Sequence, residues 1–116
     1  MKKIFSVAHL TAVLFTAPSA FAAAGGGCHF HGNAPVKEPV IVGCASNHKD
    51  DLVAKGKLDS SWKAVSLEKS QTVEGKSMKE WKLSYKNPKE KDAAKQTFYL
   101  FYLLTGNFIA ANFTGK

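Results

Sequence analysis

The chain has 116 residues and a formal net charge of +7, and its 16 basic residues are all lysines. Lysine lacks the planar fork with which arginine recognises phosphates and guanine edges, and these lysines are scattered among nine acidic residues. The composition therefore argues against nucleic-acid binding, and we attribute the charge to solubility or to a loose attraction to anionic envelope surfaces.

Residues 1–22 have the pattern of a secretory signal peptide. Lys2 and Lys3 give a positively charged start, residues 4–17 form a mostly apolar stretch, and Ala20-Phe21-Ala22 supplies the small residues that a signal peptidase recognises. The apolar stretch is shorter than the roughly 20 residues that span a bilayer, so we expect no stable membrane anchor once the signal is removed. The predicted mature protein is exported and periplasmic.

Cleavage after Ala22 leaves 94 residues, which suffice for one small domain with a single core and are too few for two. Residues 23–39 are rich in Gly, Ala and Pro and have no apolar periodicity, which predicts a flexible leader that also carries His29 and His31. We expect residues 40–116 to form the single domain.

The start of the domain has the period of an amphipathic helix that runs from Pro39 to about Lys55. Pro39 suits the first turn of a helix, and Gly56 suits its end. Ser46 could equally cap a shorter helix that begins there. The positions that recur at steps of three or four residues are Ile41, Cys44 or Ala45, His48 and Leu52.

Strand signals follow the helix. Trp62, Ala64 and Val65 with Leu67 suggest a first strand, and residues 73–76 predict a turn. In the strand after this turn, apolar and polar residues alternate, which predicts one dry face and one wet face. The apolar positions are Trp81, Leu83 and Tyr85, and the polar ones are Lys82, Ser84 and Lys86.

The end of the chain has the pattern of a β-hairpin. Residues 97–104 form the most apolar run of the mature chain, and their β-branched and aromatic content favours a strand that is buried on both faces or whose outer face meets a partner. Thr105-Gly106-Asn107 predicts a tight turn, after which residues 108–113 return antiparallel.

These elements predict an α+β fold in which one amphipathic helix packs on a three- to four-stranded antiparallel meander. The helix must cover one face of the sheet, because neither element can bury its apolar side alone. The predicted core consists of Leu52, Trp62, Leu83, Tyr85, Phe98, Leu100, Tyr102 and Phe108.

Three segments carry a resemblance to a known family: LVAKGKLDSSW at residues 52–62, WKLSYKNP at residues 81–88 and GNFIAANFTGK at residues 106–116. They resemble a family of small exported proteobacterial proteins of unknown function, whose architecture is similar to the PepSY-like helix-plus-hairpin fold. The resemblance implies no activity. PepSY-type modules are associated with inhibiting or binding exported partners, so the resemblance adds a protein partner to the alternatives without selecting it.

The mature chain contains two cysteines, Cys28 and Cys44. In an oxidising compartment, an isolated pair in a small domain is most simply a disulfide. Closing a loop of about 15 residues contributes on the order of 3 kcal/mol in the chain-entropy model. The bond would fasten the leader to the helix. A thioredoxin-like role is not expected, because the chain has no Cys-x-x-Cys motif.

Three histidines suggest a metal site. In an extended leader, His29 and His31 point to the same side. His48 follows Cys44 by four residues and therefore lies on the same face of the helix. A bond from Cys28 to Cys44 would bring the three imidazoles together, and they suit Cu(II) or Zn(II); reduced thiols would add ligands for Cu(I) or Zn(II). The alternative is a solvated His-x-His in the leader and an ordinary helix-face histidine at position 48.

Catalytic motifs are absent from the sequence, which has no nucleophile elbow, P-loop, His-Glu-x-x-His or dinucleotide-binding glycine pattern. We therefore expect a small periplasmic binding module that is not an enzyme and that binds copper or zinc through its His/Cys leader. The alternative is a metal-free PepSY-like interaction or inhibitor module, in which the sheet or its last hairpin contacts an exported protein partner.

Overall fold

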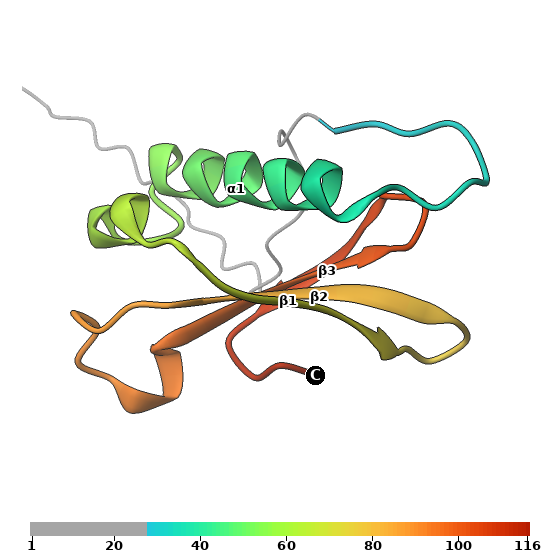
Figure 1. Cartoon of the computed structure of the whole chain (residues 1–116). Helices are drawn as coiled ribbons and strands as arrows, with labels where there is room; N and C mark the ends of the chain where they lie inside the picture. Colours follow the sequence, from blue (N-terminus) through green and yellow to red (C-terminus); the bar gives the residue numbers. More distant parts are fainter. Residues whose placement is uncertain (1–27) are drawn as a thin grey trace, which may run out of the picture.

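Four antiparallel strands form one sheet, and the helix α1 lies across one face of it (Figure 1). The computed structural model describes residues 28–116. The strand order is β1-β2-β3-β4, so each strand pairs with its neighbour in the sequence. In chain order the elements are α1 (Glu38–Ala54), the 3-10 helix η1 (Ser60–Ala64), β1 (Leu67–Glu74), β2 (Lys79–Lys86), the 3-10 helix η2 (Ala93–Lys95), β3 (Thr97–Leu103) and β4 (Phe108–Asn112).

The bounds of α1 confirm the predicted helix to within one residue at each end. A proline in the first turn presets the backbone for helix entry. Just beyond the helix end, Gly56 has a φ of 77°, in the left-handed region that glycine adopts readily. The buried side chains follow the predicted period and include two polar residues; they are Ile41, Cys44, Ala45, His48, Lys49 and Leu52.

The segment around Trp62 is the 3-10 helix η1, and the prediction that the first strand begins there was wrong. The side chain of Asp59 accepts a hydrogen bond from the backbone nitrogen of Ser61 at 2.9 Å, which caps this helix. The Trp62 indole fills the core, and its ring meets that of Phe98 edge-on with centroids 5.9 Å apart. The first strand begins only at Leu67.

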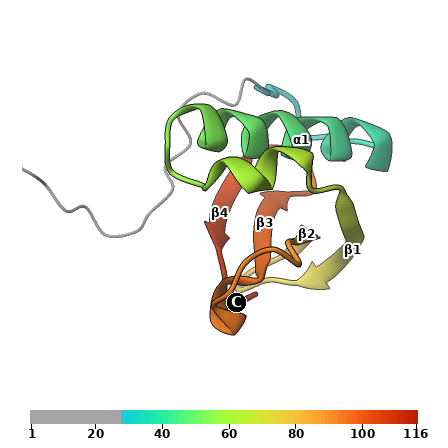
Figure 2. The ribbon, with the colours of Figure 1, turned by 90° about the vertical axis from the view of Figure 1, so that its left-hand side faces the viewer.

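The inner face of the sheet, which α1 and η1 cover, carries the predicted dry side of β2 (Figure 2). Leu83 pairs with Leu100 of β3, and Tyr85 pairs with Phe98; all four side chains are buried. Because their apolar groups interlock with the buried stripe of α1, the helix and the sheet share one core.

The β3–β4 hairpin also confirms the prediction. Gly106 has a φ of 101° in the turn, and the backbone nitrogen of Leu103 donates to the carbonyl oxygen of Asn107 at 2.8 Å. Every residue of the predicted core is buried except Phe108, which is partly buried and packs against the others.

The α+β fold class is therefore confirmed, with four strands in the meander. The predicted signal peptide, residues 1–22, and the start of the predicted leader lie outside the described residues. Between residues 28 and 116, no helix is both long and apolar enough to cross a membrane.

Candidate functional site

The predicted disulfide is present between Cys28 and Cys44, whose Cα atoms are 5.8 Å apart. It fastens residues 28–37, the N-terminal segment, to the middle of α1. This segment also reaches the β3–β4 turn, where the backbone nitrogen of Val36 donates to the carbonyl oxygen of Leu104 at 2.8 Å (Figure 1). The ring of Phe30 lies against Gly106. The N-terminal segment is thus attached to both α1 and the hairpin.

The structure does not gather the three predicted metal ligands. His29 and His31 are exposed on the N-terminal segment, whereas His48 is only 3% exposed inside the core. Among residues 28–116, no group of three or more His, Cys, Asp and Glu side chains is arranged to hold a metal ion. Both sulfur atoms are in the disulfide, so neither Cys28 nor Cys44 offers a thiolate ligand.

His48 belongs to the interface between α1 and the last two strands. Its Nδ1 atom lies 3.4 Å from the hydroxyl oxygen of Tyr102, and its ring meets that of Phe108 edge-on with centroids 4.6 Å apart. Its Nε2 atom is buried and has no hydrogen-bond partner among residues 28–116. Burial lowers the pKa of His48, the charge of Asp51 raises it and that of Lys55 lowers it further. The imidazole is therefore a neutral core group.

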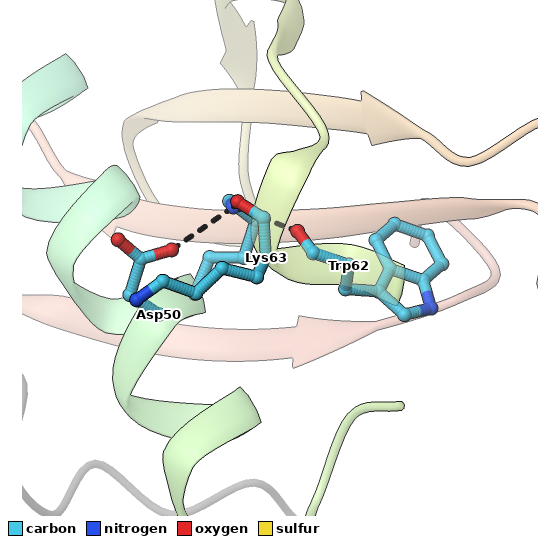
Figure 3. A network of polar contacts seen from close by, with 4 residues as sticks. Asp50, Trp62 and Lys63 are labelled. Carbon is cyan, nitrogen blue, oxygen red and sulfur yellow. Dashed lines mark hydrogen bonds and ion pairs between the residues drawn. The ribbon is translucent and has the colours of Figure 1, made fainter. Parts of the chain in front are cut away.

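The second buried polar residue of α1, Lys49, connects the helix to η1. Figure 3 labels three residues that Lys49 contacts, Asp50, Trp62 and Lys63. Its Nζ atom donates to the carbonyl oxygen of Trp62 at 2.8 Å and to that of Lys63 at 3.1 Å. The same atom pairs with the carboxylate of Asp50 at 3.1 Å and lies 5.6 Å from the centre of the Tyr85 ring. These contacts satisfy the ammonium group inside the fold, so Lys49 has a structural role.

The face of the sheet away from α1, here called the outer face, carries the wet side of β2. Around Ser84, the pairing places Lys69 of β1 on one side and Tyr99 of β3 on the other. Lys82 and Lys86 flank Ser84 along β2, because side chains two residues apart in a strand point to the same face.

These side chains surround a hollow of about 380 Å³, here called the lysine hollow. Three lysines and one glutamate face it, and the rest of its wall is hydroxyl and amide groups. The lining residues are Glu68, Lys69, Gln71, Lys82, Ser84, Lys86, Thr97 and Tyr99.

A larger groove of about 820 Å³, here called the apolar groove, adjoins the lysine hollow at Lys82, which lines both. It lies between the β1–β2 turn and the C-terminal residues Gly115 and Lys116. Met78 and Ile109 are 54% and 39% exposed, and both line this groove. Their shared position is the informative feature, because a single exposed apolar side chain is common at a protein surface. Its other apolar lining residues are Val73, Phe101, Leu103 and Ala110.

Comparison with known proteins gives a family but no activity. The family described as "Family of unknown function (DUF6488)" matches residues 1–116. The chain belongs to this family. No curated protein and no solved structure matches the chain. A proteobacterial origin and a relationship to PepSY-like folds therefore stay predictions.

For this family member, the sequence pattern pointed to part of the outer face. The alternation of Lys82, Ser84 and Lys86 with apolar residues predicts a wet face, and that face is present. What the pattern lacked was the strand register that sets Lys69 and Tyr99 on either side of Ser84. Chemically, the outer face offers ammonium groups and hydrogen-bond donors beside an exposed apolar surface, an arrangement suited to binding.

Proposed function

We propose that this protein is an exported, non-enzymatic module that binds another exported protein through the outer face of its sheet. The observation that carries the proposal is the apolar groove, in which Met78 and Ile109 are exposed next to a group of lysines. Exposed apolar surface rimmed by polar groups is typical of protein interaction sites.

The strand β3, one of the two central strands of the sheet, supports this proposal. Antiparallel sheets that are covered on one side usually carry polar residues on the other. In β3 the outward positions include Tyr99, Phe101 and Leu103, and Phe101 and Leu103 line the apolar groove. The outward positions of β3 are therefore aromatic or aliphatic where a solvated strand would carry polar residues, with Leu103 partly exposed and Phe101 only 5% exposed.

Two features support export. The first 22 residues have the composition of a cleavable signal, and the bond between Cys28 and Cys44 is of the kind that persists in oxidising compartments. Intact mass spectrometry of the protein from fractionated cells tests this step. We expect the mass of a disulfide-bonded chain that begins at Ala23 in the periplasmic fraction; an unprocessed chain in the cytosol would contradict it.

Site-specific photo-crosslinking in the native cell tests the binding face. Benzoylphenylalanine is placed at Ile109 or Met78 on the outer face, or at Val40, which is 44% exposed on α1 and serves as the matched control. We expect one defined adduct from both outer-face positions and none from Val40, with the adduct identified by mass spectrometry. Equal labelling from all three positions would reject the outer face as the binding surface.

Metal binding by the N-terminal segment is a second candidate. It is favoured by one observation: His29 and His31 are both exposed on a segment whose intervening residue, Phe30, is held against Gly106. Two imidazoles on a backbone that Cys28 and Phe30 anchor could share a Cu(II) or Zn(II) ion with water ligands. Calorimetric titration with each ion should show binding that a His29→Ala, His31→Ala double variant loses; equally weak binding by both proteins would reject this candidate.

A further inference from the structure

We propose that the outer face binds an extended peptide segment that carries acidic side chains next to apolar ones. The carboxylates would occupy the lysine hollow, and the apolar side chains would occupy the apolar groove. This inference rests on the proposed function and specifies the chemistry of the partner.

The lysine hollow concentrates positive charge that the protein itself leaves uncompensated. Lys69, Lys82 and Lys86 surround Ser84, and within residues 28–116 none of the three forms an ion pair. Lys69 lies opposite Ser84 and is therefore the diagonal neighbour of Lys82 and Lys86, at a spacing of about 7–8 Å between side chains on one face of a sheet. Like charges at this spacing repel one another in the free protein. Glu68 is the single acid in the lining. A ligand that brings carboxylates would relieve the repulsion.

The wall of the lysine hollow can also donate hydrogen bonds to a carboxylate. Ser84, Thr97 and Tyr99 contribute hydroxyl groups, and Gln71 contributes an amide. The ammonium group of Lys82 is held over the Tyr99 ring, 4.9 Å from its centre. This contact favours a position of the ammonium group beside the lysine hollow before a ligand binds.

The continuity of the two hollows indicates a ligand larger than a single anion. Lys82 lines both, and its ammonium group also lies 5.8 Å from the centre of the Phe101 ring, which belongs to the apolar groove. From there the apolar lining extends through Leu103 to Ile109. A small anion would leave this surface uncovered, whereas a peptide can cover it with apolar side chains.

The glutamates around the two hollows favour a peptide over an anionic lipid surface. Glu68 lines the lysine hollow, and Glu74 and Glu80 line the apolar groove. A charged membrane surface would face all three carboxylates at once, whereas a peptide can place its own acids only beside the lysines. A glycan would bring no apolar side chains to Leu103 or Ile109.

Selection from a random dodecapeptide library, displayed on phage, tests the inference with the mature disulfide-bonded protein as bait. We expect enriched sequences to combine Asp or Glu with large apolar residues. Enrichment of basic or purely polar sequences, or no enrichment over a blank surface, would overturn it.

Two lysine-to-glutamine triple variants then test the site with the best selected peptide. Lys69→Gln, Lys82→Gln and Lys86→Gln together should weaken binding about tenfold at low ionic strength. The matched control changes Lys89, Lys91 and Lys95, which are exposed in the β2–β3 connection, and should bind within about twofold of wild type. If both variants lose peptide affinity equally, the lysines act only through general charge attraction and the proposal is overturned. Circular dichroism verifies that both variants are folded.

The apolar groove has its own pair of variants. Ile109→Ser should weaken binding of the same peptide, and Val40→Ser on α1 should not. Sedimentation with vesicles of anionic phospholipid tests the competing ligand. If wild type and the control variant bind the vesicles but the variant at Lys69, Lys82 and Lys86 does not, the outer face binds lipid and the peptide inference is overturned.

The failure of this inference can be distinguished from that of the proposed function. If Ile109 forms a specific photo-adduct but selected peptides are not acidic, the binding face stands and the acidic chemistry is wrong. If Ile109 and Val40 label proteins equally, the proposed function itself fails.

Discussion

The ammonium group of Lys49 lies 2.8 Å from the carbonyl oxygen of Trp62 and so joins the middle of α1 to η1. The Lys49 residue that makes this contact is only 2% exposed. The same ammonium group also donates a hydrogen bond to the carbonyl oxygen of Lys63, so it binds two carbonyl oxygens of η1. The position of Trp62 in the core therefore depends on a polar contact as well as on packing.

Lys49→Met should lower the free energy of unfolding by roughly 1–3 kcal/mol, because it keeps the length of the side chain but removes the ammonium donor from both carbonyl oxygens. Within the described residues, the Trp62 oxygen then keeps only the backbone nitrogen of Val65 as a donor. Urea denaturation measures the change. Lys57→Met, at an exposed position past the end of α1, is the control and should change stability by no more than about 0.5 kcal/mol. Equal effects would show that the buried hydrogen bonds contribute nothing specific.

His48 should make stability depend on pH. Burial lowers its pKa in the folded state below the ordinary value of 6.5, so the unfolded chain binds a proton more readily than the folded one. The free energy of unfolding should therefore rise with pH. As the pH falls through about 6.5, the free energy of unfolding begins to decrease, and it continues to decrease until the pH reaches the lower pKa of His48 in the folded state.

Urea titrations between about pH 5 and pH 7.5 test this expectation. His48→Gln should flatten the pH dependence, whereas the double variant His29→Gln, His31→Gln should retain it, because those side chains are exposed. A wild-type protein whose stability is constant over this range would contradict the assignment of His48 as a neutral core group.

The disulfide should contribute on the order of 3 kcal/mol, because it closes a loop between residues 16 positions apart. Cys28→Ala, Cys44→Ala should lower the free energy of unfolding by about this amount. Wild type in the presence of a reductant provides the second measurement. Unfolding curves that are the same with and without the bond would mean that the N-terminal segment adds no stability.

Gly106→Ala should destabilise the hairpin by roughly 1–3 kcal/mol. The glycine has a φ of 101°, and an added Cβ would lie 2.5 Å from an atom of the Phe30 ring. Gly43→Ala is the matched control, because Gly43 lies inside α1 and, apart from the helix backbone around it, no atom of the described part of the chain lies within 4 Å of the added Cβ. This substitution should stabilise the protein by about 0.5–1 kcal/mol. Thermal unfolding compares the two, and a stabilising Gly106→Ala would contradict the role of the turn.

Local signals in the sequence predicted most of the fold. The three- and four-residue spacing predicted α1, the alternation around Leu83 predicted β2, and Thr105-Gly106-Asn107 predicted the last turn. The start of the first strand was predicted too early. Asp59-Ser60-Ser61 is a local helix-start signal for η1, and Lys49 of α1 holds this short helix through the carbonyl oxygens of Trp62 and Lys63.

The candidate site depended more on tertiary structure. The cysteine pairing could be predicted, since only two cysteines remain after the predicted signal peptide. His48 was assigned to a metal site although its place in the same periodic stripe as Ile41 and Leu52 already indicated burial. The lysine hollow could not be foreseen, because it requires the register between β1, β2 and β3.

The bond between Cys28 and Cys44 also determines how the protein responds to a protease. A single cut within residues 29–37 would produce two pieces that remain covalently joined and that separate only after reduction. The exposed His29 and His31 would then stay at the surface of the nicked protein. A protease that cuts in this segment therefore cannot release the N-terminal piece while the disulfide is intact, whatever the outer face binds.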